Sequence, residues 1–328
     1  MRIARWAYGA DVGEGFVDGD AVVPFPDGLQ VADVLAQGLP AAGQLWARRD
    51  TALARPLSEV RLLVPLVPAS IRDFVAFEEH VEGVSASVDG KSEVVPEWYD
   101  APTFYFTNPH TVRGTGEVIA IPVTHRLDVE LELAAVIGAA PGSDGQNLDA
   151  AAAAAHVFGY TVMNDWSARD LQSREMKVRL GPAKGKDFAT TLGPWIVTAD
   201  ELEPYLDDEG FLAVGADLFV NGELIGHDLV SNMGWPFPEL VAYASRNSVV
   251  VPGDVLGSGT VGNGGCLAEL WGRGGVVDPR PLEPGDEVRL VIEGVGEVVN
   301  IVGERVAAPA VPRARQRPRA RERATSSS

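Results

Sequence analysis

The chain has 328 residues, 46% of them hydrophobic, and a formal net charge of −19 at pH 7. This length is sufficient for one large domain or two smaller ones with a substantial core. The negative charge argues against nucleic acid as the main partner, because a phosphate backbone would be repelled. Arg313–Arg323 holds six Arg and one Glu, and we expect the basic tail, residues 309–328, to be disordered.

Cys266 is the one cysteine of the chain, so an intrachain disulfide is excluded and a reducing compartment is expected. Residues 1–9 lack the apolar run of a signal peptide. No stretch of about 18 apolar residues occurs, which predicts that no segment spans a membrane. Composition therefore predicts a cytoplasmic protein whose partners include neither membranes nor nucleic acid.

Residues 1–67 are expected to form a small β-rich N-terminal domain. Arg2–Tyr8 has the composition of a strand, and Gly19 lies between two short β-rich runs, which indicates a hairpin. A short helix is predicted over Leu29–Leu39. No candidate catalytic cluster lies in this part of the sequence, so we expect the chemistry in the second domain, residues 68–308.

Residues 73–82 have the apolar spacing of a helix, with Phe74 and Phe77 three positions apart. Asp73 stands where an N-cap residue is expected, and His80 follows two turns later on the same side. A histidine in this position is, on its own, more simply a surface residue. The polar residues 83–96 that follow fit either a lid over a site or a plain surface loop.

An aromatic-rich segment, Trp98–Thr107, is predicted to be a core strand and contains Tyr105. After it, leucines alternate with acidic residues from Leu127 onwards, which predicts another strand. Glu130 and Glu132 then project together from the face opposite the leucines. Such a pair is often a solvated acidic face, but two carboxylates side by side repel each other unless a positive group lies between them.

The apolar run that begins at Phe158 ends abruptly in Asn164 and Asp165. Asp165 is therefore expected at the end of a buried strand, where a third carboxylate can join the pair. The polar segment that follows has the features of a helix start and places Arg169 and Gln172 on one face. A glycine-flanked loop then supplies Lys186, which by composition would usually be solvated.

The last third of the chain is predicted to be mostly strands, including a hairpin with an Asn221–Gly222 turn. Gly257–Gly262 matches the pattern G-x-G-x-x-G. We expect a short strand, Cys266–Trp271, to follow it rather than an amphipathic helix, and this argues against dinucleotide binding. On that strand Glu269 would lie among apolar neighbours, which would raise its pKa.

The two motifs L-D-x-E-L-E and M-N-D-W-S-A-R-D-x-Q, at this separation, resemble the fumarylacetoacetase family, and the resemblance covers about residues 68–307. It implies an α+β fold, a mixed β-roll catalytic domain with flanking helices, and a homodimer. It also implies a divalent metal site whose ligands here are Asp73, Glu130, Glu132 and Asp165. Such hard oxygen ligands select Mg²⁺ or Ca²⁺, with Mn²⁺ as a third option.

The same resemblance implies that His80 acts as base on a water molecule and that Glu269 orients it. The implied substrate-binding residues are Arg169, Gln172, Lys186, Thr260 and Tyr105. Two tyrosines that line the pocket in the longer family members are replaced here by Val75 and Met176, which indicates a less polar distal end.

These features predict a metal-dependent hydrolase that cleaves a C–C bond in a β-diketo acid, of fumarylacetoacetate or acylpyruvate type, through a metal-stabilised enolate in aromatic or amino-acid catabolism. A decarboxylase, tautomerase or isomerase of the same family is an alternative within enzymes. A non-catalytic protein that binds 2-oxo acids is an alternative outside them. Retention of both His80 and Glu269 favours hydrolysis.

Overall fold

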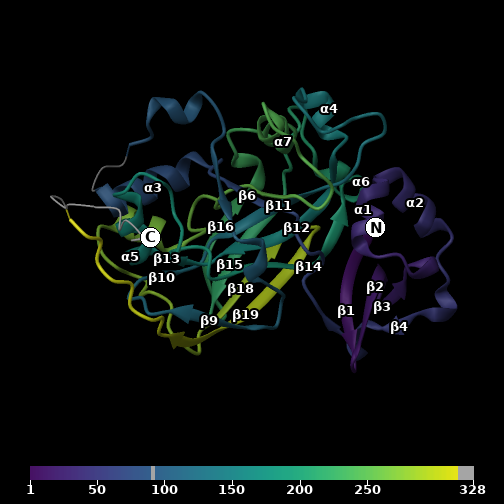
Figure 1. Ribbon diagram of the computed structural model, residues 1–328, viewed down its shortest axis with the longest axis horizontal. Coiled ribbons are helices and arrows are strands. Elements are labelled where there is room, and N and C mark those ends of the chain that lie inside the picture. The colour runs from purple at the N-terminus through teal and green to yellow at the C-terminus, as the bar shows by residue number, and fades with distance from the viewer. Residues whose placement is uncertain (90–92, 317–328) are drawn as a thin grey trace, which may run out of the picture.

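The computed structural model describes residues 1–89 and 93–316. Residues 307–316 carry neither helix nor strand, and the remainder of the predicted basic tail, 317–328, lies outside the described residues. Three sheets with flanking helices make an α+β fold (Figure 1), which confirms the predicted fold class.

The largest sheet contains the N-terminal strands and the strands that carry the site. Its strands follow the order β4 (Arg55–Pro56), β3 (Ala21–Pro24), β2 (Asp11–Asp18), β1 (Arg2–Tyr8), β14 (Thr190–Thr198), β12 (Val157–Asp165), β11 (Leu131–Ile137), β17 (Val255–Gly257), β6 (Ile71–Phe74) and β7 (Phe104–Thr107). Off this path, β5 (Arg61–Leu62) pairs with β1 and β8 (Val112–Arg113) pairs with β14. The sheet is mixed, since β17 runs parallel to β6 and β14 parallel to β8.

The second sheet packs over the central strands of the first. Its order is β16 (Glu223–Leu229), β15 (Gly215–Val220), β18 (Glu287–Ile292), β19 (Gly296–Val306) and β9 (Val118–Pro122). A short third pair joins β10 (Leu127–Asp128) to β13 (Ser167–Ala168). The predicted hairpin at Asn221–Gly222 is confirmed as the β15–β16 turn.

The helices are short and lie around these sheets. They are α1 (Val31–Gln37), α2 (Leu39–Ala47), α3 (Glu78–Asp89), α4 (Ala150–Ala154), α5 (Arg169–Met176), α6 (Ala199–Leu202), α7 (Phe237–Ser245) and α8 (Leu267–Gly274). The first predicted helix is present as α1, and a second, α2, begins directly after Gly38. In the part of the chain that the structure describes, no helix is long and apolar enough to cross a membrane.

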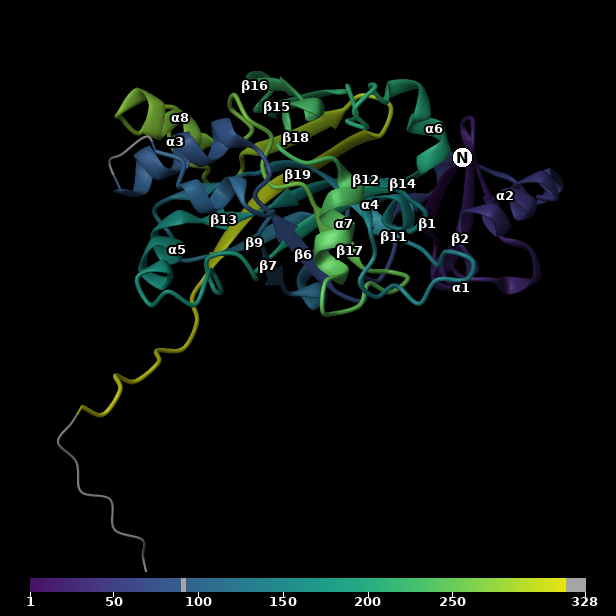
Figure 2. The same cartoon turned by 90° about the horizontal axis from the view of Figure 1, so that it is seen from above.

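The N-terminal strands β1 to β4 prolong the large sheet, because β1 pairs with β14. They lie with α1 and α2 at one end of the molecule, whereas α3, α5 and α8 lie at the other (Figure 2). The chemistry predicted for the second domain thus gathers far from the chain start. The boundary at residue 67 stays a prediction.

The strand predicted from the alternation beginning at Leu127 is confirmed only from Leu131 onwards, as β11, because Leu127–Asp128 forms β10 in another sheet and residues 129–130 lie in neither strand. Neither face of β11 is exposed to solvent. Leu131 and Leu133 enter the core between the two sheets, while Ala134 and Val136 enter a second core shared with the N-terminal helices. Glu132 projects on the same side as that second set. A carboxylate there is buried rather than solvated, so it requires a partner.

The predicted core strand Trp98–Thr107 is only partly confirmed. Its first residues belong to a 3-10 helix, Pro96–Tyr99, and the strand β7 begins at Phe104 and lies at the edge of the sheet.

Two other predicted elements were wrong in type. Asp73 does not cap a helix, because Ile71–Phe74 is a fully buried strand that pairs with β17 on one side and β7 on the other. The helix begins at Glu78 and continues to Asp89, so the segment expected as a polar loop starts as helix. Residues 90–92 lie outside the described part. Tertiary pairing here overrode a helical spacing of aromatic residues.

The second error is Cys266–Trp271, which is not a strand. Cys266 is the N-cap of α8, and Gly275 ends that helix in the left-handed conformation. Leu267 and Trp271 lie four apart and share one buried helix face. A helix therefore does follow the glycine-rich segment, but it begins beyond Gly262, whereas a dinucleotide fingerprint places its last glycine against the opening turn.

Candidate functional site

Neighbouring strands of the large sheet bring the four predicted carboxylates together. Asp73 lies on β6, Glu132 on β11 and Asp165 at the end of β12, while Glu130 precedes β11. All four side chains are buried. The strand order β12–β11–β17–β6 places them along one region of the sheet even though they span much of the sequence.

Gly257 on β17 makes this meeting of carboxylates sterically feasible. It pairs with Asp73 in register, and it lies between β11 and β6. A Cβ at this position would lie 2.6 Å from Asp73 Oδ1 and 2.7 Å from Glu132 Oε2. The absent side chain therefore leaves the space in which carboxylates from two non-adjacent strands face each other.

These carboxylates have more oxygen atoms than the surrounding hydrogen-bond donors satisfy. One oxygen each of Asp73, Glu130 and Glu132 lies within 4.8 Å of the others. Four oxygens of the four predicted ligands have no hydrogen-bond donor among residues 1–89 and 93–316: Asp73 Oδ1, Asp165 Oδ1 and both oxygens of Glu132. Burial first, and then neighbouring carboxylates, raise the pKa of Asp73 and of Glu132 well above the usual range. Unpartnered hard oxygens at this spacing fit a divalent cation.

Two cationic side chains, Lys186 and Arg169, contact this carboxylate cluster. Lys186 Nζ lies 2.6 Å from Asp165 Oδ2 and also donates to Glu130. Arg169 Nη2 lies 2.7 Å from Glu130 Oε1. Burial alone would raise the pKa of Glu130, but Lys186 and Arg169 outweigh it and lower that pKa. Glu130 is therefore held ionised. Tyr105 completes the group by donating its hydroxyl to Asp165.

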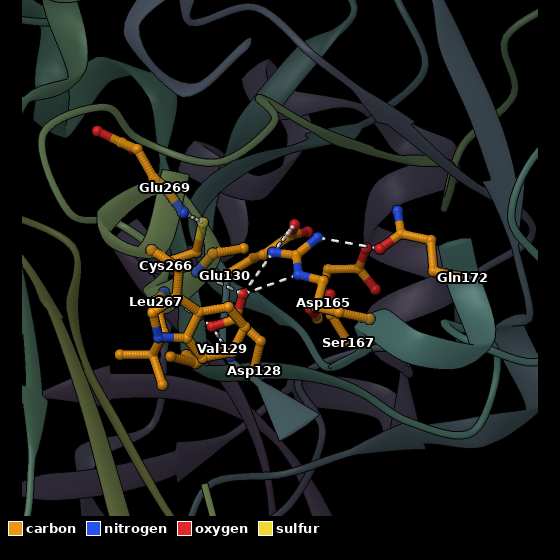
Figure 3. A network of polar contacts seen from close by, with 12 residues as sticks. Asp128, Val129, Glu130, Asp165, Ser167, Gln172, Cys266, Leu267 and Glu269 are labelled. Atoms are coloured by element: carbon orange, nitrogen blue, oxygen red, sulfur yellow. Dashed lines mark hydrogen bonds and ion pairs between the residues drawn. The ribbon is translucent and has the colours of Figure 1, made fainter. Parts of the chain in front are cut away.

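Arg169 has a contact at each of its three guanidinium nitrogens, and Nη2 lies 2.7 Å from Asp128 Oδ2 as well as from Glu130 Oε1. Its Nη1 donates to Gln172 Oε1 at 3.1 Å, one turn later on α5, which confirms that the two residues share a helix face. Its Nε donates to Asp128 Oδ2 at 2.8 Å. Figure 3 shows Asp128, Glu130 and Gln172 gathered in this polar network.

Asp128 is a site residue that the sequence reasoning missed. It is fully buried, and besides Arg169 it accepts the backbone N–H groups of Leu267 at 2.8 Å and Ala268 at 3.0 Å. It therefore ties Arg169 to the first turn of α8. The available signal was its place in a buried strand, where an ionised side chain requires a cation and donors.

The predicted base lies on the helical side of the site. His80 is 7% exposed on α3, and burial lowers its pKa to about 3, so its imidazole is neutral. Its Nδ1 lies 3.6 Å from Cys266 Sγ. Glu269 has a carboxylate oxygen within 4.8 Å of this pair.

Glu269 is held mainly by neighbours on its own helix, α8, and on the segment just before it. Its Oε1 pairs with Arg273 Nη2 at 2.9 Å and accepts Gly264 N–H at 3.2 Å. Its Oε2 has no hydrogen-bond partner among the described residues. Burial raises the pKa of Glu269 to about 7, as its apolar setting predicted, although on a helix rather than a strand. A direct orienting contact with His80 stays a prediction.

A pocket of about 330 Å³ joins the two sides of the site. Its polar lining is formed by predicted residues: Asp73, His80, Tyr105, Glu130, Glu132, Arg169, Gln172, Lys186 and Thr260. Its apolar lining includes Val75, Val84, Phe104, Met176 and Pro182. Glu269 lies behind His80, outside this lining, and Asp165 reaches the site through Lys186 and Tyr105.

The sequence matches the family described as "Fumarylacetoacetate (FAA) hydrolase C-terminal" over residues 69–303. A fumarylacetoacetase from Arabidopsis thaliana is 33% identical over 263 residues, which are 66% of this chain and 62% of that protein. The chain thus covers less than two thirds of the length of that relative. The oxaloacetate tautomerase YisK from Bacillus subtilis is 30% identical over 264 residues, 79% of each protein.

Solved structures share the fold. A maleylpyruvate hydrolase from Sphingobium sp. SYK-6, solved with manganese(II) and pyruvate, superimposes with a TM-score of 0.67 at 22% identity. The superposition covers 93% of this chain and all of that one. Similarity at this identity shows that the architecture is common to both proteins.

Proposed function

The chain belongs to the fumarylacetoacetate hydrolase family, and we propose that it is a metal-dependent hydrolase that cleaves a C–C bond in a β-diketo acid. The observation that carries this proposal is the buried cluster of carboxylate oxygens without donors, facing Lys186 and Arg169 on one side and His80 on the other. Such a site suits an anionic, chelating substrate.

The residues that would hold the metal are Asp73, Glu130, Glu132 and Asp165. Their hard oxygens favour Mg²⁺, Ca²⁺ or Mn²⁺ over zinc or copper. When bound, the cation would polarise the oxo groups of the substrate and stabilise negative charge on the departing carbon. The manganese in the Sphingobium hydrolase is in keeping with this expectation.

The cationic side chains would position the acid head of the substrate. Arg169 can offer its delocalised charge to a carboxylate, Lys186 a point charge and Gln172 an amide. Burial opposes the positive charge of Lys186, but Asp165 and Glu130 outweigh it and raise the pKa of Lys186, so it stays protonated. Thr260 and Tyr105 lie in the same lining.

His80 would take the proton from an attacking water molecule. Its lowered pKa keeps a neutral nitrogen available at pH 7. The imidazolium that forms would face Glu130 and, behind it, the ionised form of Glu269, both of which favour the positive charge. Water held at this point would then be delivered to the carbonyl carbon, with cleavage of the adjacent C–C bond.

The apolar lining defines the substrate class more narrowly. The family resemblance implies that Val75 and Met176 stand where longer members have tyrosines, and both residues line the pocket together with Phe104. An uncharged acyl group fits this lining better than the second carboxylate of fumarylacetoacetate. We therefore place acylpyruvates or shorter relatives ahead of fumarylacetoacetate.

A tautomerase is the second candidate. The YisK relative aligns over 79% of both proteins, and a tautomerase needs the same chelating head without an attacking water. The absence of a hydrogen bond between His80 and Glu269 in the described residues favours this alternative. A decarboxylase would also use the head group without water, and a non-catalytic binding protein would use it without turnover.

A substrate panel separates these candidates. Purified protein with Mg²⁺, Mn²⁺ or Ca²⁺ is assayed for loss of diketo-enol absorbance on acylpyruvates and fumarylacetoacetate, and for keto–enol exchange of oxaloacetate. Release of a carboxylic acid plus pyruvate or acetoacetate, identified by mass spectrometry, supports hydrolysis. Accelerated exchange without cleavage supports the tautomerase, carbon dioxide as the small product the decarboxylase, and binding without turnover the binding protein.

A further inference from the structure

A second group of metal-ligand side chains lies behind the pocket. The imidazole of His80, the thiol of Cys266 and the carboxylate of Glu269 are buried, and one ligand atom of each lies within 4.8 Å of the other two. We infer that these three side chains form a separate site for a soft divalent cation such as Zn²⁺, whose binding inhibits the reaction at His80. The binding stands without the proposed function, whereas the inhibition rests on it.

The spacing of the first two ligands already matches zinc. His80 Nδ1 and Cys266 Sγ are 3.6 Å apart. Bonds of about 2.3 Å to sulfur and about 2.0 Å to nitrogen at a tetrahedral angle separate two such ligands by roughly 3.5 Å. Glu269 supplies the third ligand through a carboxylate oxygen. Its Oε2 is available for this, because that buried atom has no hydrogen-bond partner among residues 1–89 and 93–316.

The framework around these ligands is rigid. Cys266 and Glu269 occupy the N-cap and the first turn of α8, and Glu269 N–H donates to Cys266 Sγ at 3.4 Å. Asp128 fixes the same helix start by accepting the backbone N–H groups of Leu267 and Ala268. His80 comes from α3, which packs so closely on α8 that a Cβ at Gly83 would lie 2.4 Å from Glu269 Cγ. The site therefore requires little reorganisation.

The chemistry of the ligands differs from that of the carboxylate cluster. A thiolate, an imidazole and one carboxylate select Zn²⁺ or Co²⁺, while four carboxylates select Mg²⁺, Mn²⁺ or Ca²⁺. The thiol is protonated before binding, since burial raises its pKa. Binding then breaks the S–H bond, forms the metal–sulfur bond and releases the proton to solvent. The Glu269 N–H, which donates to Cys266 Sγ, favours the resulting thiolate.

Inhibition follows from the position of His80. Its ring lines the substrate pocket, so a cation can reach it through that pocket. A cation on Nδ1 places positive charge against the ring and opposes uptake of a proton by the other nitrogen. The same side chain would then serve either as a base or as a metal ligand.

Cobalt(II) is the probe for binding, because thiolate-to-cobalt charge transfer absorbs in the near ultraviolet and oxygen ligands give no such band. The chain has one cysteine, so the band can arise from Cys266 alone. Mg²⁺-saturated protein is titrated with Co²⁺ and then with Zn²⁺. We expect one equivalent of Co²⁺ to give the band and Zn²⁺ to remove it. No band in the wild-type protein would overturn the proposal.

The variants assign the ligands. Cys266→Ser keeps an N-cap side chain that serine provides well, and Cys266→Ala serves as a second test. Both should abolish the band and weaken Zn²⁺ binding by calorimetry at least about tenfold, because even outer groups of metal sites contribute that much. Glu130→Gln/Glu132→Gln is the matched control and should keep the band. Unchanged Zn²⁺ affinity in both Cys266 variants would overturn the site.

The inhibition is measured on the Mg²⁺ enzyme, with each variant normalised to its own rate without zinc. We expect the Zn²⁺ concentration for half-inhibition to rise at least about tenfold in Cys266→Ser, in parallel with the loss of affinity. Equal inhibition of wild type and variant would show that zinc acts at the carboxylates instead. If no diketo acid is turned over, the proposed function fails, while the cobalt titration still decides the metal site.

Discussion

The two walls of the site are built from different kinds of element. Asp73, Glu130, Glu132 and Asp165 lie on or beside strands of the large sheet, which fixes their spacing through hydrogen-bonded neighbours on both sides. His80, Cys266 and Glu269 lie on two short helices, α3 and α8, that rest against each other. The first wall is a rigid anionic cluster and the second a neutral group at the edge of a pocket.

We therefore expect the two walls to have different roles in the reaction. The sheet wall carries several carboxylates close together, and hydrogen bonds between the strands hold them in place. Lys186 and Arg169 balance part of their charge. The helical wall carries groups that exchange protons, and its two helices are joined by side-chain packing rather than by the backbone hydrogen bonds of a sheet. Changes in the sheet wall should therefore alter metal binding, and changes in the helical wall should alter turnover and its pH dependence.

The largest effect is expected in the sheet wall. Glu132→Gln replaces a carboxyl group whose two oxygens have no donor among the described residues, and so removes a metal ligand. We expect turnover to fall at least about a thousandfold, because a bound metal contributes several kcal/mol to such reactions. Calorimetry with Mg²⁺ and Mn²⁺ should show weakened binding. Glu223→Gln, at an exposed acid on β16, is the control; full metal affinity in Glu132→Gln would remove Glu132 from the ligand set.

The next effect tests the helical wall. His80→Ala removes the group proposed to accept the proton, and kcat should fall by roughly a hundredfold or more, the scale of general-base loss. Metal affinity should remain that of the wild type, because His80 lies outside the carboxylate cluster. His110→Ala, at an exposed histidine, is the matched control. Near-normal turnover in His80→Ala would favour a mechanism without an attacking water.

The sequence predicted the sheet wall better than the helical wall, for a physical reason. Alternation of apolar and acidic residues from Leu127 to Leu133 predicts a strand, which is present from Leu131 onwards as β11. The apolar run that begins at Phe158 likewise predicts where β12 ends, at Asp165. The role of Gly257 depends on which strands are neighbours, which no local pattern contains. The distance between His80 and Cys266 depends likewise on how two helices pack.

The two errors of element type arise from short segments. At Ile71–Phe74, four residues are too few for a periodicity to separate strand from helix, and pairing with β17 and β7 decides the outcome. At Leu267–Gly274, glycines on both sides obscured a helix whose Leu267 and Trp271 spacing was already helical. The residues predicted to form the site nevertheless lie close together. Their prediction rested on the order of the family motifs along the chain and not on whether each segment is a helix or a strand.

A smaller effect concerns pH. Burial raises the pKa of Glu269 to about 7, with Arg273 opposing and Glu79 adding to the shift. Below that pH the carboxyl is protonated and cannot stabilise the imidazolium of His80, so kcat should rise with pH through about 7. Glu269→Gln should lower kcat roughly tenfold or more and remove that rise. A retained rise in the variant would assign it to another group.

As pH rises, the free energy of unfolding should change in the opposite direction to kcat. The pKa of Glu269 is higher in the folded than in the unfolded chain, where it is about 4.3. The folded state therefore binds more protons between these values, and the free energy of unfolding should fall as pH rises from about 4.3 to about 7. Denaturant unfolding of wild type and Glu269→Gln checks this, since the variant should show a shallower decline over that range.

The smallest effects come from two glycines, one in each wall, which test the comparison most directly. A Cβ in Gly257→Ala would lie 2.6 Å from Asp73 Oδ1, and one in Gly83→Ala would lie 2.4 Å from Glu269 Cγ. Gly257→Ala should push the carboxylates apart and weaken metal binding by several-fold to about tenfold. Gly83→Ala should separate α3 from α8 and lower kcat by a similar factor while metal affinity is retained.

Gly43→Ala on α2 is the control for the substitution itself, since its Cβ would meet one side-chain atom at 4.0 Å and alanine favours a helix. It should leave metal affinity and kcat unchanged. Calorimetry and steady-state kinetics on the three variants give six values, which should fall into separate metal and turnover defects. If both glycine variants lost metal affinity and turnover together, the sheet and helical walls would act as one unit, because strain introduced at α3 would then reach the carboxylates through Asp128 and Arg169.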